Sequence, residues 1–232
     1  MLGSLLVFSS QSATVEGKGA VVVTATDARV ENIMSESHDI DVIVVGGGPA
    51  GLSAGLFASK NGLETTLFDT DGTWMHKAHL FNYLGIGSVG GSEFLATARQ
   101  QVDDFGVDRR QGEEVTDIES TDGGFTVETE AESYEAQYVV LATGANRDLA
   151  ESLGCAFDGD VVDVGVDMET SVENAYATGA MVRPEEWQAA ISVGDGAAAA
   201  LNILSKERGE HFHDFDTPAD AESVFGDLVD GA

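Results

Sequence analysis

Hydrophobic residues gather in short continuous runs that alternate with longer stretches of small and apolar residues. The run Ile40–Val45 ends in a series of glycines and is typical of a buried parallel strand. Pro49–Lys60 predicts a helix that ends at Asn61 and Gly62. Thr65–Phe68 predicts the next strand. This order of strand, turn, helix and strand indicates a βαβ unit.

The rest of the pattern continues the alternation of helices and strands. We expect helices at Glu93–Phe105 and Trp187–Leu204, and strands around Phe125–Val127, at Tyr138–Ala142 and at Tyr176–Thr178. The segment 70–92 is polar, rich in glycine and without a clear period, which is typical of a functional loop. The chain therefore predicts an α/β fold with a central parallel sheet, flanking helices and a small antiparallel β-meander.

The pattern predicts one domain at residues 34–210, between two segments of different character. Residues 1–33 read as an N-terminal extension, either disordered and loosely attached or produced by a start upstream of a natural Met34. A competing interpretation is an extra edge strand at Ala20–Thr24. Leu2–Phe8 follows no basic region, which argues against a signal peptide. Residues 211–232 read as an acidic, partly disordered tail.

The charge of the chain excludes several kinds of partner. Eleven Lys and Arg stand against 41 Asp and Glu, a formal net charge of −30 over 232 residues. Such a surface repels nucleic acid and anionic membranes, and we expect neither as a partner. The hypothesis that explains this charge is adaptation to high salt, in which counterions screen carboxylate repulsion. The single cysteine, Cys155, fits a reducing cytoplasm, and no apolar run reaches the ~20 residues that span a bilayer.

Glycines follow the first strand at a spacing that favours a bound dinucleotide. In Gly46-x-Gly48-x-x-Gly51, the first glycine allows a tight turn and the second lets the backbone approach a pyrophosphate. The third lets the helix pack closely on the strand. Asp69 follows the second strand, where a carboxylate can accept hydrogen bonds from ribose hydroxyls. The competing interpretation is a glycine-rich turn without a ligand.

Several motifs, in order, resemble the FAD-binding parts of thioredoxin-reductase-like flavoproteins. They are Val44–Ala54, Asn82–Gly85, Gly91–Gly106, Tyr138–Ala145, and a C-terminal pair at Thr170–Gly179 and Gln188–Ala190. Leu84 stands where the family usually has proline. The resemblance extends over residues 39–206 and implies a Rossmann-type domain with FAD as its cofactor.

The resemblance also implies which residues contact the cofactor. The expected FAD-binding residues are Gly46, Gly48, Pro49, Ala50 and Gly51 at the pyrophosphate, Asp69 at the ribose, Val115 at the adenine through its backbone, and Asn82, Ala142, Thr143, Gly144, Gly179, Ala180, Gln188 and Ala189 toward the flavin. His79 is expected to be a donor near the flavin that stabilises its reduced anion. No catalytic side chain is singled out.

Three departures from the family pattern bear on function. The family inserts an NAD(P)H domain where this chain has only Ala145–Glu169, about 25 residues, which are too few for a doubly wound domain. No Cys-x-x-Cys dithiol occurs in the chain. The family's Gly-Asp is Gly179-Ala180 here, which removes an expected hydrogen bond to the ribityl chain.

Two further patterns carry weaker signals. Gly194–Ala199 imitates a second dinucleotide motif, but the residues before it predict a helix rather than a strand. The pairs His76/His79 and His211/His213 lack the additional ligands of a metal site, so no metal is expected.

The sequence leaves three functions open. The first is an FAD-dependent oxidoreductase, reduced by a redox partner protein or by a diffusing small-molecule reductant and not self-sufficient as a disulfide reductase. The second is a non-catalytic FAD- or nucleotide-binding sensor or subunit module. The third is a relative that binds no cofactor, which Ala180 motivates. Homodimerisation is left open.

Overall fold

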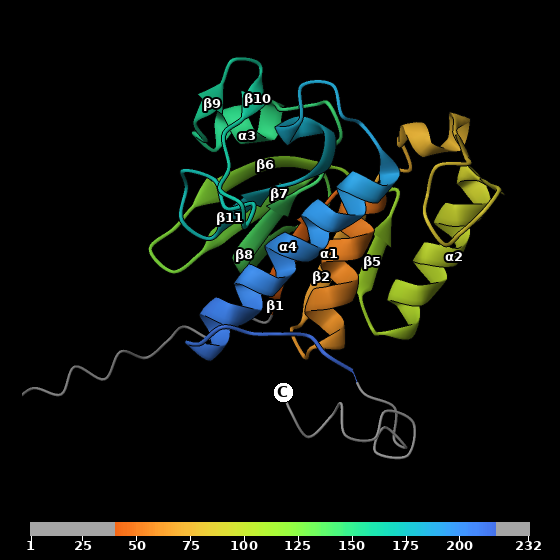
Figure 1. Ribbon diagram of the computed structural model, residues 1–232. Coiled ribbons are helices and arrows are strands. Elements are labelled where there is room, and N and C mark those ends of the chain that lie inside the picture. Colours follow the sequence, from red (N-terminus) through yellow and green to blue (C-terminus); the bar gives the residue numbers. More distant parts are fainter. Residues whose placement is uncertain (1–39, 217–232) are drawn as a thin grey trace, which may run out of the picture. The chain divides into compact units, whose positions relative to one another are not determined.

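The computed structural model describes residues 40–216 (Figure 1). The expectations for residues 1–33, including the strand at Ala20–Thr24, lie outside the described residues, as does the tail after residue 216.

A seven-stranded sheet forms the centre of the fold, in the order β5-β2-β1-β8-β7-β6 with β11 also paired to β8. The strands are β1 (Ile40–Val45), β2 (Thr65–Asp69), β5 (Asp108–Gln111), β6 (Val115–Ser120), β7 (Phe125–Thr129), β8 (Ser133–Leu141) and β11 (Ala175–Ala177). Strands β5, β2, β1, β8 and β11 are parallel, whereas β6, β7 and β8 form an antiparallel meander. The predicted α/β fold with a parallel sheet and a small β-meander is confirmed.

Helices α1 and α4 lie side by side across one face of this sheet (Figure 1). The helices are α1 (Pro49–Lys60), α2 (Gly91–Asp104), α3 (Asp148–Ser152) and α4 (Ala189–Arg208), with 3₁₀ turns η1 (Trp74–Lys77) and η2 (Gly179–Val182). Two small hairpins pair β3 (His79–Leu80) with β4 (Val89–Gly90), and β9 (Phe157–Asp158) with β10 (Val161–Val162). Helix α4 contains the whole second glycine pattern, and Gly196 lets it pack closely against Ala50 of α1.

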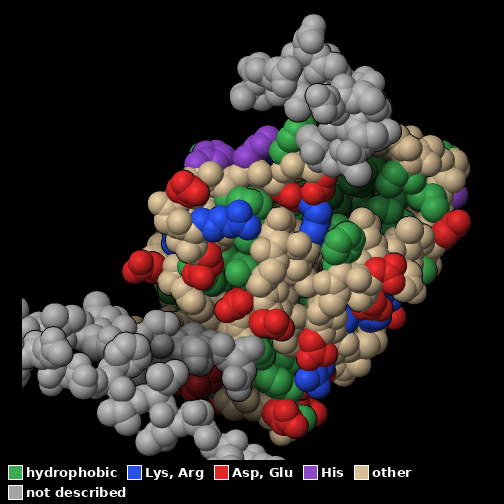
Figure 2. Space-filling view, turned by 90° about the horizontal axis from the view of Figure 1, so that it is seen from below, with side chains coloured by type: hydrophobic (Ala, Val, Ile, Leu, Met, Phe, Trp, Pro, Cys, Tyr) green, Lys and Arg blue, Asp and Glu red, His purple; other side chains and the backbone are tan. Residues whose placement is uncertain are grey.

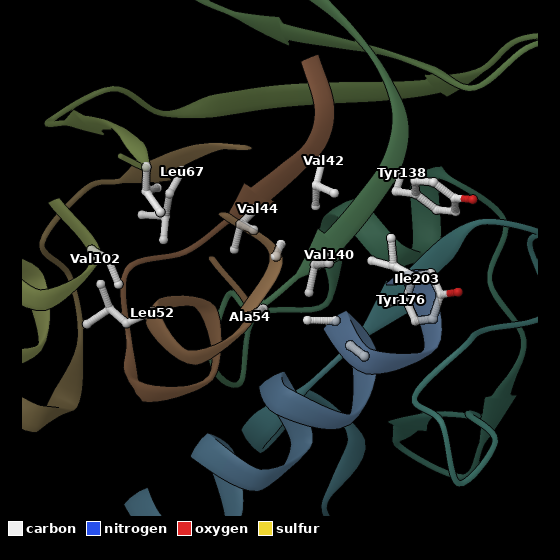
Figure 3. Close-up of a cluster of buried hydrophobic side chains, with 14 of the residues drawn as sticks. Val42, Val44, Leu52, Ala54, Leu67, Val102, Tyr138, Val140, Tyr176 and Ile203 are labelled. Carbon is white, nitrogen blue, oxygen red and sulfur yellow. The ribbon is translucent and has the colours of Figure 1, made fainter. Parts of the chain in front are cut away.

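Both faces of the central strands are buried, which explains their continuous apolar runs. Val42 and Val44 of β1 face α1 and α4, where they join a cluster with Val140 and Ile203 (Figure 3). The alternate residues of β1, which include Ile43, belong to a second cluster with β6, β7 and α3.

Several element boundaries differ from the sequence expectation for identifiable reasons. Strand β8 begins at Ser133 rather than Tyr138, because its more polar first half pairs with β7. Strand β5, Asp-Arg-Arg-Gln, is an edge strand on β2 that has no apolar pattern to reveal it. The segment 70–92 is not entirely a loop, since it contains η1 and the β3–β4 pair.

Ion pairs between nearby side chains offset part of the acidic charge. Arg109 pairs with Asp103, and Lys60 of α1 holds Asp214 at 2.7 Å, so the first residues after 210 contact the domain. Figure 2 shows one face of the molecule on which acidic side chains are scattered, several of them beside Lys or Arg. In residues 40–216, no helix is long and apolar enough to cross a membrane.

Candidate functional site

A cavity of about 800 Å³ lies at the carboxyl ends of the parallel strands. Val45 and Asp69, which end β1 and β2, line it together with Ala142 after β8 and Thr178 after β11. This edge of a parallel sheet is where α/β proteins bind ligands, and the volume falls in the range of small-molecule and cofactor sites.

Most of the predicted binding residues line this one cavity. They are Gly46, Gly48, Pro49, Ala50, Asp69, Val115, Ala142, Thr143, Gly144, Gly179, Ala180, Gln188 and Ala189. The structure thus brings together residues that are more than a hundred positions apart in the sequence. Gly51, His79 and Asn82 do not line it.

Three glycines of the first turn are required by the packing of the protein itself. Gly46 has φ of +118°, and a Cβ there would overlap the carbonyl oxygen of Ala142. A Cβ at Gly47 would overlap the carboxyl group of Asp69, and one at Gly51 would overlap the carbonyl oxygen of Gly46. Only glycine fits these positions, because the surrounding atoms approach too closely to leave room for a Cβ.

Gly48 has a different reason to be glycine. Its φ of −81° suits any residue, and a Cβ there would lie 3.5 Å from its nearest neighbour, Thr73 Oγ1. Gly48 lines the cavity. The absence of a side chain at Gly48 therefore leaves space in the cavity, and packing within the protein does not require glycine at this position. This is the property expected where a backbone must approach a ligand closely.

The N-terminus of α1 gives this space a preference for anions. The first helical hydrogen bond runs from the N–H of Leu52 to the carbonyl of Gly48, at 3.0 Å. The N–H groups of Ala50 and Gly51 come before it, and neither a capping side chain nor an acidic residue of the first turn competes for them. Free N–H groups and the helix dipole favour a phosphate at such a position.

Asp69 is held in a fixed orientation beside the glycine turn. It is 2% exposed, and its Oδ1 accepts a hydrogen bond from the N–H of Asp71 at 2.8 Å. Its Oδ2 accepts one from Arg99 Nη2 at 2.8 Å. Because a carboxylate accepts up to about four hydrogen bonds, Asp69 retains capacity for a ligand hydroxyl.

A chain of hydrogen-bonded polar side chains extends from Asp69 to Ser92 in the first turn of α2. Arg99 also contacts Asp71, and Asp71 shares a hydrogen bond of 2.7 Å with His76 Nε2. His76 Nδ1 in turn contacts Ser92 Oγ at 2.9 Å. The hydrogen bond from Arg99, and next that from His76, lowers the pKa of Asp71. These contacts connect β2, η1 and α2 on one side of the cavity.

Another part of the cavity wall is held by an arginine. Arg147 donates hydrogen bonds to the carbonyl oxygens of Ala145 (3.0 Å), Met181 (3.1 Å) and Ala180 (3.3 Å). No carboxylate forms an ion pair with Arg147 in the described part of the chain. Gly179 has φ of +72°, and both Gly179 and Ala180 line the cavity.

Asn82 and His79 occupy different surroundings. Asn82 donates a hydrogen bond of 2.7 Å to Gln188 Oε1 at the N-terminus of α4, so it contacts a residue of the cavity wall without lining the cavity itself. His79 is exposed, shares a hydrogen bond of 2.9 Å with Ser88 Oγ and packs against Phe81. Residues 40–216 contain no group of three or more His, Cys, Asp or Glu side chains that could hold a metal ion.

Sequence reasoning missed several residues of the cavity wall. Trp74 and Trp187 line it and contact each other. Glu113, also in the wall, accepts hydrogen bonds from Thr129 Oγ1 (2.9 Å) and from Tyr134 (3.0 Å). Burial raises the pKa of Tyr134 to about 12, and the hydrogen bond to Glu113 is the second cause of this increase. Trp187 begins a helix that the sequence predicts, but no motif points to any of the three wall side chains as part of a cavity, so only the tertiary structure reveals this role.

Comparisons with known proteins agree with this geometry. Residues 40–150 and 84–194 match the family described as pyridine nucleotide-disulphide oxidoreductase. One component of the alkyl hydroperoxide reductase of Staphylococcus aureus is 35% identical over 125 residues, 53% of this chain and 24% of that protein. A ferredoxin–NADP reductase of Levilactobacillus brevis is 28% identical over 119 residues, 48% of this chain and 35% of that protein. The chain thus spans a quarter to a third of the length of these relatives.

Thioredoxin reductases have the same fold in solved structures. The thioredoxin reductase of T. acidophilum superposes with a TM-score of 0.69 at 20% identity, and the match covers 74% of this chain and 100% of that one.

Proposed function

Since the chain belongs to the pyridine nucleotide-disulphide oxidoreductase family, we propose that it is an FAD-dependent oxidoreductase domain. The observation that carries this proposal is Gly48, whose missing side chain opens the cavity directly in front of the N-terminus of α1. A turn without a ligand would need glycine at 46, 47 and 51 but not at 48. The open space at residue 48 therefore supports a ligand that approaches the backbone closely there.

Each part of the cavity suits a part of this cofactor. The N-terminus of α1, with the N–H of Ala50 in the cavity wall, would hold the pyrophosphate, and Asp69, oriented by Arg99, would accept hydrogen bonds from the ribose. The walls at Val115 and at Gly144 would hold the adenine and the flavin. When bound, FAD supplies the redox chemistry, whereas the protein binds it, orients it and excludes water.

Electrons would reach this domain from a redox partner protein or a small-molecule reductant. Residues 145–169, where the family inserts its NAD(P)H domain, form only α3 and the β9–β10 hairpin. Such a segment is far too short for a second dinucleotide-binding domain. The proposed enzyme therefore requires an external donor.

The chain would not reduce a disulfide substrate by itself. Thiol–disulfide exchange needs one thiolate to attack the disulfide and a second thiol to resolve the mixed disulfide. Cys155 is the single cysteine of the chain and is buried, and burial raises the pKa of its thiol. We expect no NADPH-dependent thioredoxin reduction by the purified chain in high salt, also after Cys155→Ser. Turnover that persists in this variant would contradict the proposal and indicate direct flavin chemistry.

An anaerobic reductive titration tests the central proposal. The purified chain is first examined for flavin absorbance and for FAD binding by calorimetry, then titrated with NADPH and separately with reduced ferredoxin. Bound flavin that is bleached by either reductant supports an oxidoreductase. Bound flavin that neither reductant bleaches supports the alternative of an FAD-binding sensor or subunit module. A chain that binds no FAD overturns both.

We also propose that the acidic composition is an adaptation to high salt in a cytoplasmic protein. A formal charge of −30 produces strong self-repulsion at low ionic strength, which counterions screen. Unfolding should therefore occur at a higher temperature in molar KCl than in dilute buffer. Equal stability in both conditions would contradict this explanation.

A further inference from the structure

The chain has two tryptophans, and both line the same cavity. Trp74 lies in η1 and Trp187 lies just before α4, more than a hundred positions away. Their ring centroids are 5.4 Å apart at an angle of 59°. Both remain accessible, since Trp74 is 61% exposed and Trp187 is 42% exposed. Large exposed rings that gather at a cavity are typical of a binding surface.

The two rings are attached to the protein in different ways. Trp187 Nε1 donates a hydrogen bond of 2.9 Å to the carbonyl of Arg183, and Arg183 forms an ion pair with buried Asp195 of α4. Trp187 is therefore fixed to the body of the domain. Trp74 has no side-chain hydrogen bond in the part of the chain that the structure describes, and its anchor is the 3₁₀ turn that Thr73 caps.

The separation of the rings limits how a ligand can use them. At 5.4 Å the two tryptophans are in direct contact, so no third ring fits between them. A flat ring in the cavity would instead lie against the inner side of the pair. The neighbouring residues Gln188, which caps α4, and Ala189, which begins it, line the cavity as well, so Trp187 lies beside the residues that the family resemblance assigns to the flavin.

We propose that Trp74 and Trp187 form an aromatic lid that closes over the flat, heteroaromatic ring of a bound ligand. Trp187 is the fixed half of this lid and Trp74 is the half that moves when the ligand enters or leaves. The inference rests on the proposed function in that the ring is taken to be the flavin of FAD. The lid shields that ring from water and slows its release.

The emission of bound flavin tests the contact, because an indole ring in contact with a flavin quenches flavin fluorescence and a phenyl ring does not. FAD bound to the unmodified chain should emit weakly. Trp187→Phe and Trp74→Phe should brighten it at the same bound fraction. Trp74→Ala should release FAD about 2- to 10-fold faster, as expected for a lost aromatic contact. Phe81→Leu is the matched control, since Phe81 is an exposed ring that does not line the cavity.

The outcomes separate the lid from the proposed function. The lid would be overturned, and the FAD proposal would stand, if calorimetry shows FAD binding but two other results fail. These failures are bright flavin emission in the unmodified chain and an unchanged rate of FAD release from Trp74→Ala. A chain that binds no FAD would overturn both. ADP, which lacks the flavin ring, should bind the unmodified chain and Trp74→Ala with equal affinity. A loss of ADP affinity in Trp74→Ala would show a general structural effect and overturn the lid.

Discussion

The two ends of the cavity are built in different ways. The end at the glycine turn comes mainly from residues 40–69, and positions 46, 47 and 51 leave no room for a Cβ because Ala142, Asp69 and Gly46 lie too close. The other end is assembled from segments around residues 74, 144, 180 and 188, and side-chain contacts such as Arg147 to η2 and Trp74 to Trp187 hold it. The first end depends mainly on backbone geometry and close packing at the glycines, whereas the second depends on contacts between side chains of distant segments.

The largest effect should follow from a methyl group at Gly51. In Gly51→Ala the new Cβ would overlap the carbonyl oxygen of Gly46, which is backbone and cannot turn away as a side chain can. We expect a loss of about 3 kcal/mol or more in the free energy of unfolding, as in severe overpacking of a core. Thermal denaturation followed by circular dichroism measures it. Gly48→Ala is the control, and equal stability of the two variants would contradict the different roles of these glycines.

The next prediction separates folding from binding within the same turn. In Gly48→Val the new Cβ would lie no closer than 3.5 Å to any other side chain or distant backbone atom, so the helical circular dichroism should largely survive. Flavin retention should be abolished, because the backbone can no longer approach the pyrophosphate. Flavin content is measured by absorbance after purification. Unchanged content would count against the FAD proposal as a whole.

The same difference explains what could be predicted from the sequence. The sheet strands Ile40–Val45 and Thr65–Asp69, the helix between them and the glycine turn follow from apolar runs and from backbone constraints that each residue carries by itself. Arg99, which orients Asp69, comes from a helix thirty positions later in the sequence, and no local pattern links the two. Trp187 and Trp74 likewise meet only in the folded chain.

At the other end of the cavity, Arg147→Met should weaken the wall. Three carbonyl oxygens would lose a charged donor, and the guanidinium is partly buried. We expect a decrease of about 2 kcal/mol in the free energy of unfolding, in the range of hydrogen bonds to charged groups. Urea unfolding in constant high salt measures it. Arg110→Met, which removes an exposed pair with Asp108, should change it by only about 0.5 kcal/mol. Similar losses in both variants would show that Arg147 does not support η2.

The smallest predicted effect is a gain, from Ala180→Asp. Ala180 lines the cavity where the related family has a carboxylate, and an aspartate there would accept a hydrogen bond from a ribityl hydroxyl. We expect FAD to bind about 5- to 30-fold more tightly, which corresponds to about 1–2 kcal/mol for a charge-assisted bond. Calorimetry measures the change, and Ala180→Asn provides a side chain of the same size without the charge.

The position of Arg147 gives the Ala180→Asp variant two outcomes that can be told apart. Its guanidinium lies 3.3 Å from the carbonyl oxygen of Ala180, so a carboxylate at position 180 has a second partner within the protein. If the new aspartate pairs with Arg147, the variant becomes more stable to urea but gains no affinity for FAD. If it faces the cavity, affinity rises in Ala180→Asp more than in Ala180→Asn. Weaker binding in the aspartate variant would show that this end of the cavity is built around a different contact, in contrast to the glycine turn, whose geometry follows the family pattern.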